Sequence, residues 1–238
     1  MAIMQKTEPI EIERSSFLRH LLKQAGAFLV GFADLSCLNL KTTDEFPFGI
    51  CFYLRYEDSA VNDLPNDNKW LRMRARLHDK AKDIYGAAKE YISSQGYRYS
   101  KITSRIPSDE LPDLQEELPQ KTLATLSGLG WIGRSTLLVT PEYGPRVRIG
   151  TLITNMPLSV ETPIVESSCG DCTACVDTCP VKAIKGKLWL SGIMRSELLD
   201  VKRCYEYLCS SKPTLGRRQT CALCLKVCPI GQNHKHDC

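Results

Sequence analysis

The sequence has no long apolar run and almost no cysteine before residue 169. No stretch reaches the roughly eighteen consecutive apolar residues that a membrane-spanning helix requires, and residues 1–8 carry neither the apolar core nor the twin arginine of an export signal. Only Cys37 and Cys51 precede residue 169, whereas secreted disulfide scaffolds distribute their cysteines along the chain. These absences predict a protein of the reducing cytoplasm, without a membrane partner, whose thiols stay available as metal ligands.

The remaining ten of the 12 cysteines lie in the C-terminal part, and seven of them form two closely spaced runs. The first run reads Cys169-x2-Cys172-x2-Cys175-x3-Cys179-Pro180, and the second reads Cys221-x2-Cys224-x3-Cys228-Pro229. Bacterial ferredoxins have this spacing, and the fourth cysteine of their run binds the other cluster when two clusters are present. The proline after each run ends the loop without exposing an unpaired N–H.

This spacing predicts two 4Fe–4S clusters. One cluster is expected to have the ligands Cys169, Cys172, Cys175 and Cys228, and the second to have Cys179, Cys221 and Cys224 with a fourth thiolate from Cys204 or Cys209. A disulfide framework and zinc held by CxxC pairs are the alternatives. Zinc sites favour two separated pairs, and nothing indicates an oxidising compartment, so the clusters are preferred.

Length and charge limit the other interpretations. A chain of 238 residues corresponds to one large domain or two modest ones, and 43% hydrophobic residues allow a sizeable core. The formal charge of +4 would be offset by two clusters of about −2 each, so it does not indicate nucleic-acid binding.

The N-terminal part predicts a mixture of helices and strands, with a division into domains at 1–160 and 161–238. Amphipathic or apolar patterns predict helices at 8–26, 69–95 and 119–127, and strands at 28–35, 48–56, 97–104, 135–140 and 146–154. The last two strands are expected to form a hairpin. Residues 58–68 and 107–119 are predicted to be loops.

A G-x-G-x-x-G motif lies at Gly128, Gly130 and Gly133. In a dinucleotide-binding fold this motif follows a strand and opens a helix. Here a helical pattern precedes it and a strand pattern follows it, so a Rossmann fold is rejected. The glycines still predict a close approach of the backbone to another group.

Three segments resemble the epoxyqueuosine reductase family and its relatives, the corrinoid-dependent reductive dehalogenases. They are Gly-Leu-Gly-Trp-Ile-Gly-Arg at 128–134, Thr-Pro-Glu-Tyr-Gly-Pro-Arg-Val-Arg-Ile-Gly at 140–150, and the two cysteine runs. The resemblance covers about residues 122–230 and implies an α+β fold: a nitroreductase-like domain that binds cobalamin, followed by a ferredoxin-like domain with two 4Fe–4S clusters. Electrons would pass from a donor such as ferredoxin or flavodoxin through the clusters to the cobalamin.

The resemblance also implies roles for individual residues. The family's Arg-Cys-x-x-Tyr stretch matches 203–207, which favours Cys204 over Cys209 as the eighth ligand. The cofactor candidates, which match the segment that lines the corrin pocket, are Gly128, Gly130, Gly133, Arg134, Tyr143 and Gly144. The catalytic candidates are Arg134, which would supply positive charge, and Tyr143 or Tyr53, which would donate a proton.

The sequence departs from the family in ways that argue against tRNA as the substrate. The family's acidic general acid precedes the glycine motif, but residues 102–105 contain no acidic side chain. The family's C-terminal helical repeats, which help to grip tRNA, have no counterpart in the 238 residues. We therefore expect a reductive reaction on an unidentified small molecule or protein. The alternative is a ferredoxin-like electron carrier that holds no cobalamin or holds a flavin instead.

Overall fold

A computed structural model describes residues 9–38, 40–64, 67–102, 118–211 and 221–232. Its centre is a four-stranded sheet in the order β1-β2-β6-β3, in which every neighbouring pair is antiparallel. The strands are β1 (Leu29–Asp34), β2 (Phe48–Arg55), β3 (Tyr99–Lys101) and β6 (Val147–Thr154). The strands β4 (Trp131–Ile132) and β5 (Leu138–Val139) form a separate two-stranded ladder.

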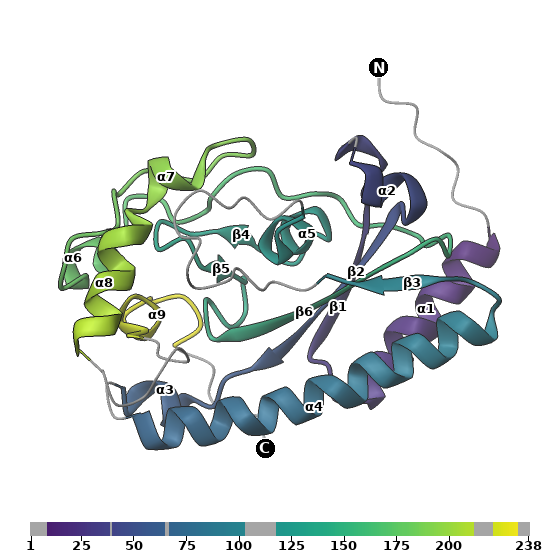
Figure 1. Cartoon of the computed structure of the whole chain (residues 1–238), viewed down its shortest axis with the longest axis horizontal. Helices are drawn as coiled ribbons and strands as arrows, with labels where there is room; N and C mark the ends of the chain where they lie inside the picture. The colour runs from purple at the N-terminus through teal and green to yellow at the C-terminus, as the bar shows by residue number, and fades with distance from the viewer. Residues whose placement is uncertain (1–8, 39, 65–66, 103–117, 212–220, 233–238) are drawn as a thin grey trace.

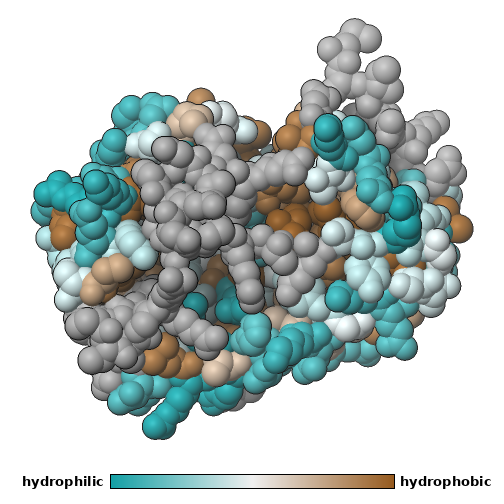
Figure 2. Space-filling view, viewed as in Figure 1, coloured by the Kyte–Doolittle hydropathy of each residue, from teal (hydrophilic) through white to brown (hydrophobic). Residues whose placement is uncertain are grey.

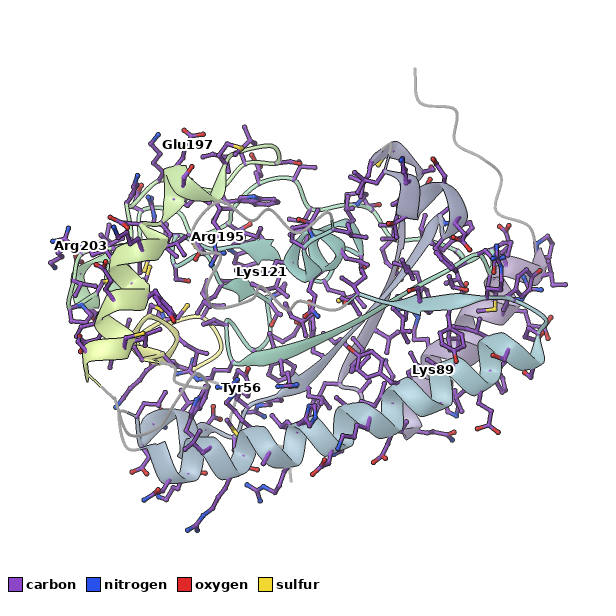
Figure 3. All side chains as sticks on the ribbon, viewed as in Figure 1. Tyr56, Lys89, Lys121, Arg195, Glu197 and Arg203 are labelled. Carbon is purple, nitrogen blue, oxygen red and sulfur yellow. The ribbon has the colours of Figure 1, made fainter. Side chains whose placement is uncertain are left out.

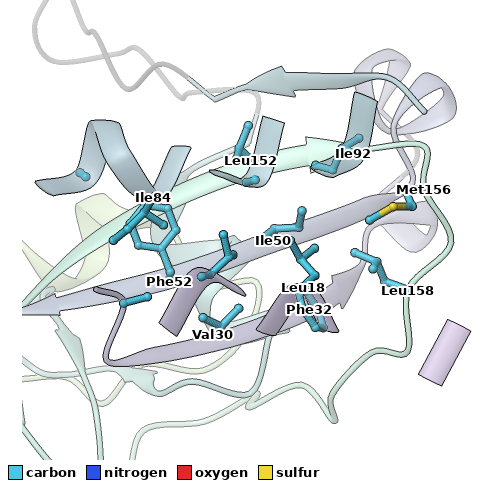
Figure 4. Close-up of a cluster of buried hydrophobic side chains, with 14 of the residues drawn as sticks. Leu18, Val30, Phe32, Ile50, Phe52, Ile84, Ile92, Leu152, Met156 and Leu158 are labelled. Atoms are coloured by element: carbon cyan, nitrogen blue, oxygen red, sulfur yellow. The ribbon is translucent and has the colours of Figure 1, made fainter. Parts of the chain in front are cut away.

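Two helices, α1 (Pro9–Gln24) and α4 (Asp67–Ser94), cover one face of the sheet (Figure 1). Successive side chains of a strand point to opposite faces, so the even-numbered residues of β2 meet these helices. Figure 4 shows the resulting core, in which Ile50 and Phe52 of β2 lie between the side chains of α1 and those of α4. Each fully buried aliphatic side chain here contributes about 1.5–3 kcal/mol. The residues of this core that are labelled in Figure 4 are Leu18, Val30, Phe32, Ile50, Phe52, Ile84, Ile92, Leu152, Met156 and Leu158.

The odd-numbered residues of β2 face a second core on the other side of the sheet. Cys51 and Tyr53 pack there with Leu123 and Ala124 of α5 (Gln120–Leu126) and with Leu138 of β5. The sheet thus lies between a layer formed by helices α1 and α4 and a layer that carries the glycine motif. The short elements η1 (Ser36–Leu38), α2 (Lys41–Glu45) and α3 (Asp58–Asn62) connect the strands and helices.

The cysteine-rich part contains the short helices α6 (Ala174–Thr178), α7 (Arg195–Leu198) and α9 (Leu223–Lys226) and the longer α8 (Val201–Ser211). Helices α6 and α9 pack together, and α9 also packs on α3. Ala222 and Leu225 lie in one apolar cluster with Trp70 and Met73 of α4. The predicted division after residue 160 falls in the segment that joins this part to β6. There, Glu161 N donates to the Phe32 carbonyl at 3.1 Å, and the Glu161 carboxylate accepts from Arg19 and from the Phe32 N–H.

The helices predicted at 8–26, 69–95 and 119–127 and the strands predicted at 28–35, 48–56 and 146–154 agree with this architecture, whereas other predictions differ from it. Residues 58–62 form the helix α3 rather than a loop. The predicted hairpin of 135–140 with 146–154 is wrong, because β5 pairs with β4 whereas β6 is an interior strand between β2 and β3. In the helix predicted at 8–26, the apolar side chains of Ile10 and Phe17 are 59% and 53% exposed, and Leu18 and Leu22 form the buried face. The stretch around residues 103–105 and the loop predicted at 107–119 lie largely outside the described residues.

Hydrophilic side chains cover the outer face of α4 in Figure 2. Several of its charges are paired at the surface: Arg76 with Glu57, and Lys82 with Asp79, both at 2.8 Å. Among the helices of the described ranges, none combines the length and the apolar character needed to cross a bilayer.

Candidate functional site

Four thiols from both cysteine runs form a first group, and one of them, Cys169, lies beside the glycine segment. Cys169, Cys172 and Cys228 all act electrostatically on the thiol of Cys175, which α6 carries. The charges of Cys169 and Cys172 likewise raise the pKa of Cys228. The thiols of the first run therefore lie close enough to influence one another, and the last cysteine of the second run lies near them. These are the four residues predicted as ligands of the first cluster.

A second group contains Cys179, Cys204, Cys221 and Cys224. The charges of Cys179 and Cys221 raise the pKa of Cys204, and the charges of all three thiols raise the pKa of Cys224 in α9. Cys204 and Cys209 both lie on α8, but five residues of an α-helix correspond to a rotation of about 140°, so the two side chains point in different directions. Cys209 is exposed and is not among the charges that act on Cys204 or Cys224. The position of Cys204 thus suits the eighth ligand that was left open between these two residues.

The chemistry of these thiols fits an iron–sulfur cluster. Burial, followed by the charges of neighbouring thiols, raises the pKa of Cys175 to about 11 and that of Cys224 to about 12. Burial also raises the pKa of Cys204 and of Cys228. Four bare thiolates would repel one another in such a place, whereas the positive charge of iron would offset this repulsion. Among the described residues, no three His, Cys, Asp or Glu side chains are placed to bind one metal ion. A 4Fe–4S cluster does not need such a site, because each of its four irons binds one thiolate.

The two groups approach each other at Cys175 and Cys224. Cys175 is among the charges that raise the pKa of Cys224, although it belongs to the other group. The packing of α6 on α9 produces this approach, and both side chains lie against the apolar cluster that contains Cys179 and Leu199. A negative charge on Cys175 of the first group therefore raises the pKa of Cys224 in the second.

Two arginines on either side of β5 fix the cysteine-rich part to the sheet. Arg134 donates to the carbonyls of Gly186 and Gly170, the latter at 2.7 Å, and so holds the loop of the first run. Arg146 is 2% exposed and donates to the carbonyls of Lys226 at 3.2 Å and Cys228 at 3.4 Å. Each arginine therefore positions the backbone of one cysteine run.

Arg146 was not selected from the sequence, where it reads as one residue of a strand. Its Nε lies 3.4 Å from Oδ1 of Asp58, close enough for an ion pair, although neither atom has a hydrogen-bond partner in the part of the chain that the structure describes. Burial lowers the pKa of the Arg146 guanidinium, and Asp58 partly opposes this. In turn, Arg146 lowers the pKa of Cys228, against the larger effect of burial. The alternation of charged and apolar residues at 146–149 was the available signal, but it could not show which arginine is buried.

The glycines of the motif face other parts of the chain. A Cβ on Gly130 would lie 2.3 Å from the Val139 carbonyl oxygen, and one on Gly128 would lie 2.9 Å from that of Thr162. A Cβ on Gly133 would meet Val139 and approach Sγ of Cys169 to 3.4 Å. The close approach predicted for this motif is thus present and is made by the chain itself. Contact of these glycines with a corrin stays a prediction.

The two tyrosines proposed as proton donors have different surroundings. Tyr53 is fully buried, its hydroxyl donates to the Leu129 carbonyl, and burial raises its pKa. Tyr143 is half-buried, with its ring 5.1 Å from the Arg55 guanidinium and packed edge-on against Phe28. Gly144 follows in a turn and packs against the backbone of Ile230. Their roles toward a substrate or cofactor stay predictions.

Charged side chains surround the helices that carry the second group. Figure 3 shows Arg195 and Glu197 at α7 and Arg203 on the outer side of α8. Arg195 lowers the pKa of Cys204, while burial and the thiols of Cys179 and Cys221 raise it more strongly. Lys121 of α5 donates to the Thr136 carbonyl at 2.5 Å and ties α5 to the segment between β4 and β5.

Comparison with known proteins defines the class first. Residues 168–231 match the family described as a 4Fe–4S double cluster binding domain. The chain also resembles epoxyqueuosine reductases, as the sequence indicated. It is 33% identical over 144 residues to the enzyme of Listeria monocytogenes and 28% identical over 192 residues to that of Pseudomonas aeruginosa. These matches span 56% and 74% of this chain but only 35% and 51% of the relatives, so the chain spans about a third to a half of their length.

Solved structures of reductive dehalogenases and of epoxyqueuosine reductases share the fold of this chain. A catabolic reductive dehalogenase superposes with a TM-score of 0.69 at 18% identity, over 93% of this chain and 32% of the other. Epoxyqueuosine reductase from Bacillus subtilis superposes with a TM-score of 0.64 at 20% identity, over 94% of this chain and 67% of the other. The likeness includes the sheet part as well as the cysteine-rich part, because it extends over nearly the whole chain.

Proposed function

We propose that this protein is an iron–sulfur reductase that passes electrons through two 4Fe–4S clusters to a cofactor in its N-terminal domain. The observation that carries this proposal is the assembly of eight cysteines into two groups of four, inside a segment that matches a double-cluster family. Cys169, Cys172, Cys175 and Cys228 would hold one cluster, and Cys179, Cys204, Cys221 and Cys224 the other. Electrons would pass between the clusters at Cys175 and Cys224.

We further propose cobalamin as the cofactor and assign it to residues 1–160, with the nitroreductase-like fold expected there. This rests on the fold likeness to a reductive dehalogenase described as B12-dependent, which superposes with a TM-score of 0.70 at 18% identity. Reduced cobalamin supplies electrons for reductive chemistry. Arg134 has a buried Nε without a hydrogen-bond partner among the described residues. This donor is available to an anionic group beside the first cysteine loop.

The substrate belongs to the same proposal. One solved epoxyqueuosine reductase is described in complex with an epoxyqueuosine-modified tRNA stem loop. This brings tRNA back as a candidate, although the missing acidic residue at 102–105 argued against it. A modified stem loop is therefore the first substrate to test, followed by small molecules. Ferredoxin or flavodoxin are the proposed electron donors.

Metal content tests the proposal directly. The protein is purified without air, incubated with hydroxocobalamin and desalted, and its iron, cobalt and visible spectrum are recorded. We expect about eight irons and about one cobalt per chain. Fewer than four irons would contradict the cluster assignment, whereas eight irons without cobalt would contradict only the cobalamin assignment.

The electron carrier is the second candidate. The packing of the motif glycines against the chain itself favours it, because the side of each glycine that lacks a Cβ is already occupied. The two candidates differ in colour after the same desalting step. Clusters alone give broad absorbance, whereas a bound corrin or flavin adds resolved visible bands.

A further inference from the structure

A tryptophan of the glycine segment donates a hydrogen bond to a cysteine sulfur. Nε1 of Trp131 lies 3.5 Å from Sγ of Cys169, which is one of the four thiols of the first group. Trp131 is 7% exposed and forms the first residue of β4. The bond therefore joins the β4–β5 ladder to the proposed first cluster.

The surrounding backbone holds this indole in place. Trp131 pairs with Val139 in the β4–β5 ladder, and the preceding Gly130 packs directly on the Val139 carbonyl. The ring belongs to an apolar cluster with Trp189, Leu198 and the side chain of Cys169. Because the ring has a fixed place and little contact with water, its N–H cannot exchange the sulfur for solvent at low cost.

We propose that Trp131 sets the reduction potential of the cluster bound by Cys169 through this N–H···S bond. One-electron reduction makes the cluster and its thiolates more negative, with no bond formed or broken in the protein. A hydrogen bond to a ligand sulfur stabilises the more negative form, and such bonds are among the determinants of cluster potentials. The bond therefore favours the reduced state and raises the potential of the first cluster. Trp131 is a positioning residue in this role because it acts through Cys169.

The second group receives a different donor. The main-chain N–H of Ala183 donates to Sγ of Cys179 at 3.3 Å. A side-chain substitution at position 131 does not remove that bond. The potential of the second cluster thus serves as an internal reference for the first.

The experiment compares Trp131→Phe with Trp189→Phe in the whole, cluster-loaded protein. Trp189 is also 7% exposed and lies in the same apolar cluster, and among the described residues its indole donates to no cysteine sulfur. Clusters are titrated with dithionite and followed by electron paramagnetic resonance, with iron measured in each sample. In Trp131→Phe we expect one of the two potentials to fall, so that the ratio of reduced to oxidised cluster at a fixed potential drops between about threefold and tenfold. A tenfold drop corresponds to 59 mV for one electron.

The outcomes separate this inference from the proposed function on which it rests. Unchanged potentials in Trp131→Phe with about eight irons retained, or equal shifts in both tryptophan variants, would overturn the role of the N–H while leaving the clusters in place. A wild-type protein that binds no iron would overturn both. If Trp131→Phe does not fold, 3-benzothienylalanine at position 131 keeps the shape of the ring and removes only the N–H. The same fall in one potential is then expected, and its absence counts against the proposal.

Discussion

Gly144 and Gly231 pack backbone against backbone where the turn after β5 meets the end of the second cysteine run. A Cβ on Gly231 would lie 2.1 Å from the carbonyl carbon of Tyr143, and a Cβ on Gly144 would lie 2.0 Å from the Ile230 carbonyl oxygen. Both glycines have positive φ angles, +55° and +79°. The second cysteine run can therefore approach the sheet part only because neither residue has a side chain.

Replacement of Gly231 by alanine is expected to separate these two segments. The added Cβ overlaps backbone atoms that cannot move independently, so the free energy of unfolding should fall by roughly 2 kcal/mol or more, and Cys228 should lose its place. Denaturant unfolding and iron content measure both effects. Gly192→Ala is the matched control, since Gly192 has φ +90° with open space around it and should lose only about 1 kcal/mol. Equal losses in the two variants would contradict the packing argument.

Replacement of Arg146 by lysine is expected to destabilise the protein by roughly 3 kcal/mol. A lysine ammonium cannot reach the carbonyls of both Lys226 and Cys228 while it faces Asp58. At least one carbonyl therefore keeps only the hydrogen bond from the Gln232 side chain, and the half-buried Asp58 carboxylate loses part of its pairing. Because these carbonyls flank Cys228, iron retention should also fall. Arg148→Lys on the same strand is the control: Arg148 is half-buried and lies beside His78. A loss of stability without loss of iron would show that Arg146 holds the fold but not the cluster.

The eighth cluster ligand is tested with two serine variants on one helix. Cys204→Ser should lower the iron content from about eight to about four per chain after anaerobic reconstitution, because one cluster loses a thiolate. Cys209→Ser should leave it unchanged, since Cys209 is exposed on another side of α8. The opposite pattern would move the ligand to Cys209 and require α8 to turn.

Tyr53 predicts a dependence of stability on alkaline pH. Burial raises the pKa of its phenol in the folded protein, whereas the unfolded chain ionises this group near pH 10. The contribution of neutral Tyr53 to the free energy of unfolding is therefore complete below pH 10. It is lost as the pH rises toward the pKa of Tyr53 in the folded protein. Tyr53→Phe should lose about 1 kcal/mol at pH 8, because the Leu129 carbonyl loses its donor, and should then show a shallower decline between pH 10 and 11. Denaturant unfolding at each pH measures this, with Tyr97→Phe, at a half-exposed ring, as the control. An unaltered decline would show that Tyr53 does not titrate as its burial implies.

The cysteine spacing predicted seven of the eight thiols that lie in the two groups, and it left the eighth open between Cys204 and Cys209. Ligands three or four residues apart lie in one tight loop whatever the rest of the chain does, so their proximity is a local property. The amphipathic stripe of α4 is local in the same sense, and its residues Ile84, Ala88 and Ile92 are buried as its period indicates.

The tertiary structure decided the contacts between segments far apart in the chain. β5 pairs with β4 and not with β6 because β6 is already bonded on both sides, to β2 and β3, and no local pattern shows that occupancy. The hydrogen bond from Trp131 to Cys169 spans 38 residues, and those from Arg146 to the second cysteine run span about 80. The sequence alone thus determined which thiols share a tight loop, and the structure decided that Cys204, rather than Cys209, lies with Cys179, Cys221 and Cys224. Long-range packing determined which tryptophan, arginine and glycines hold them, because burial and hydrogen bonding at those positions depend on partners that only the folded chain supplies.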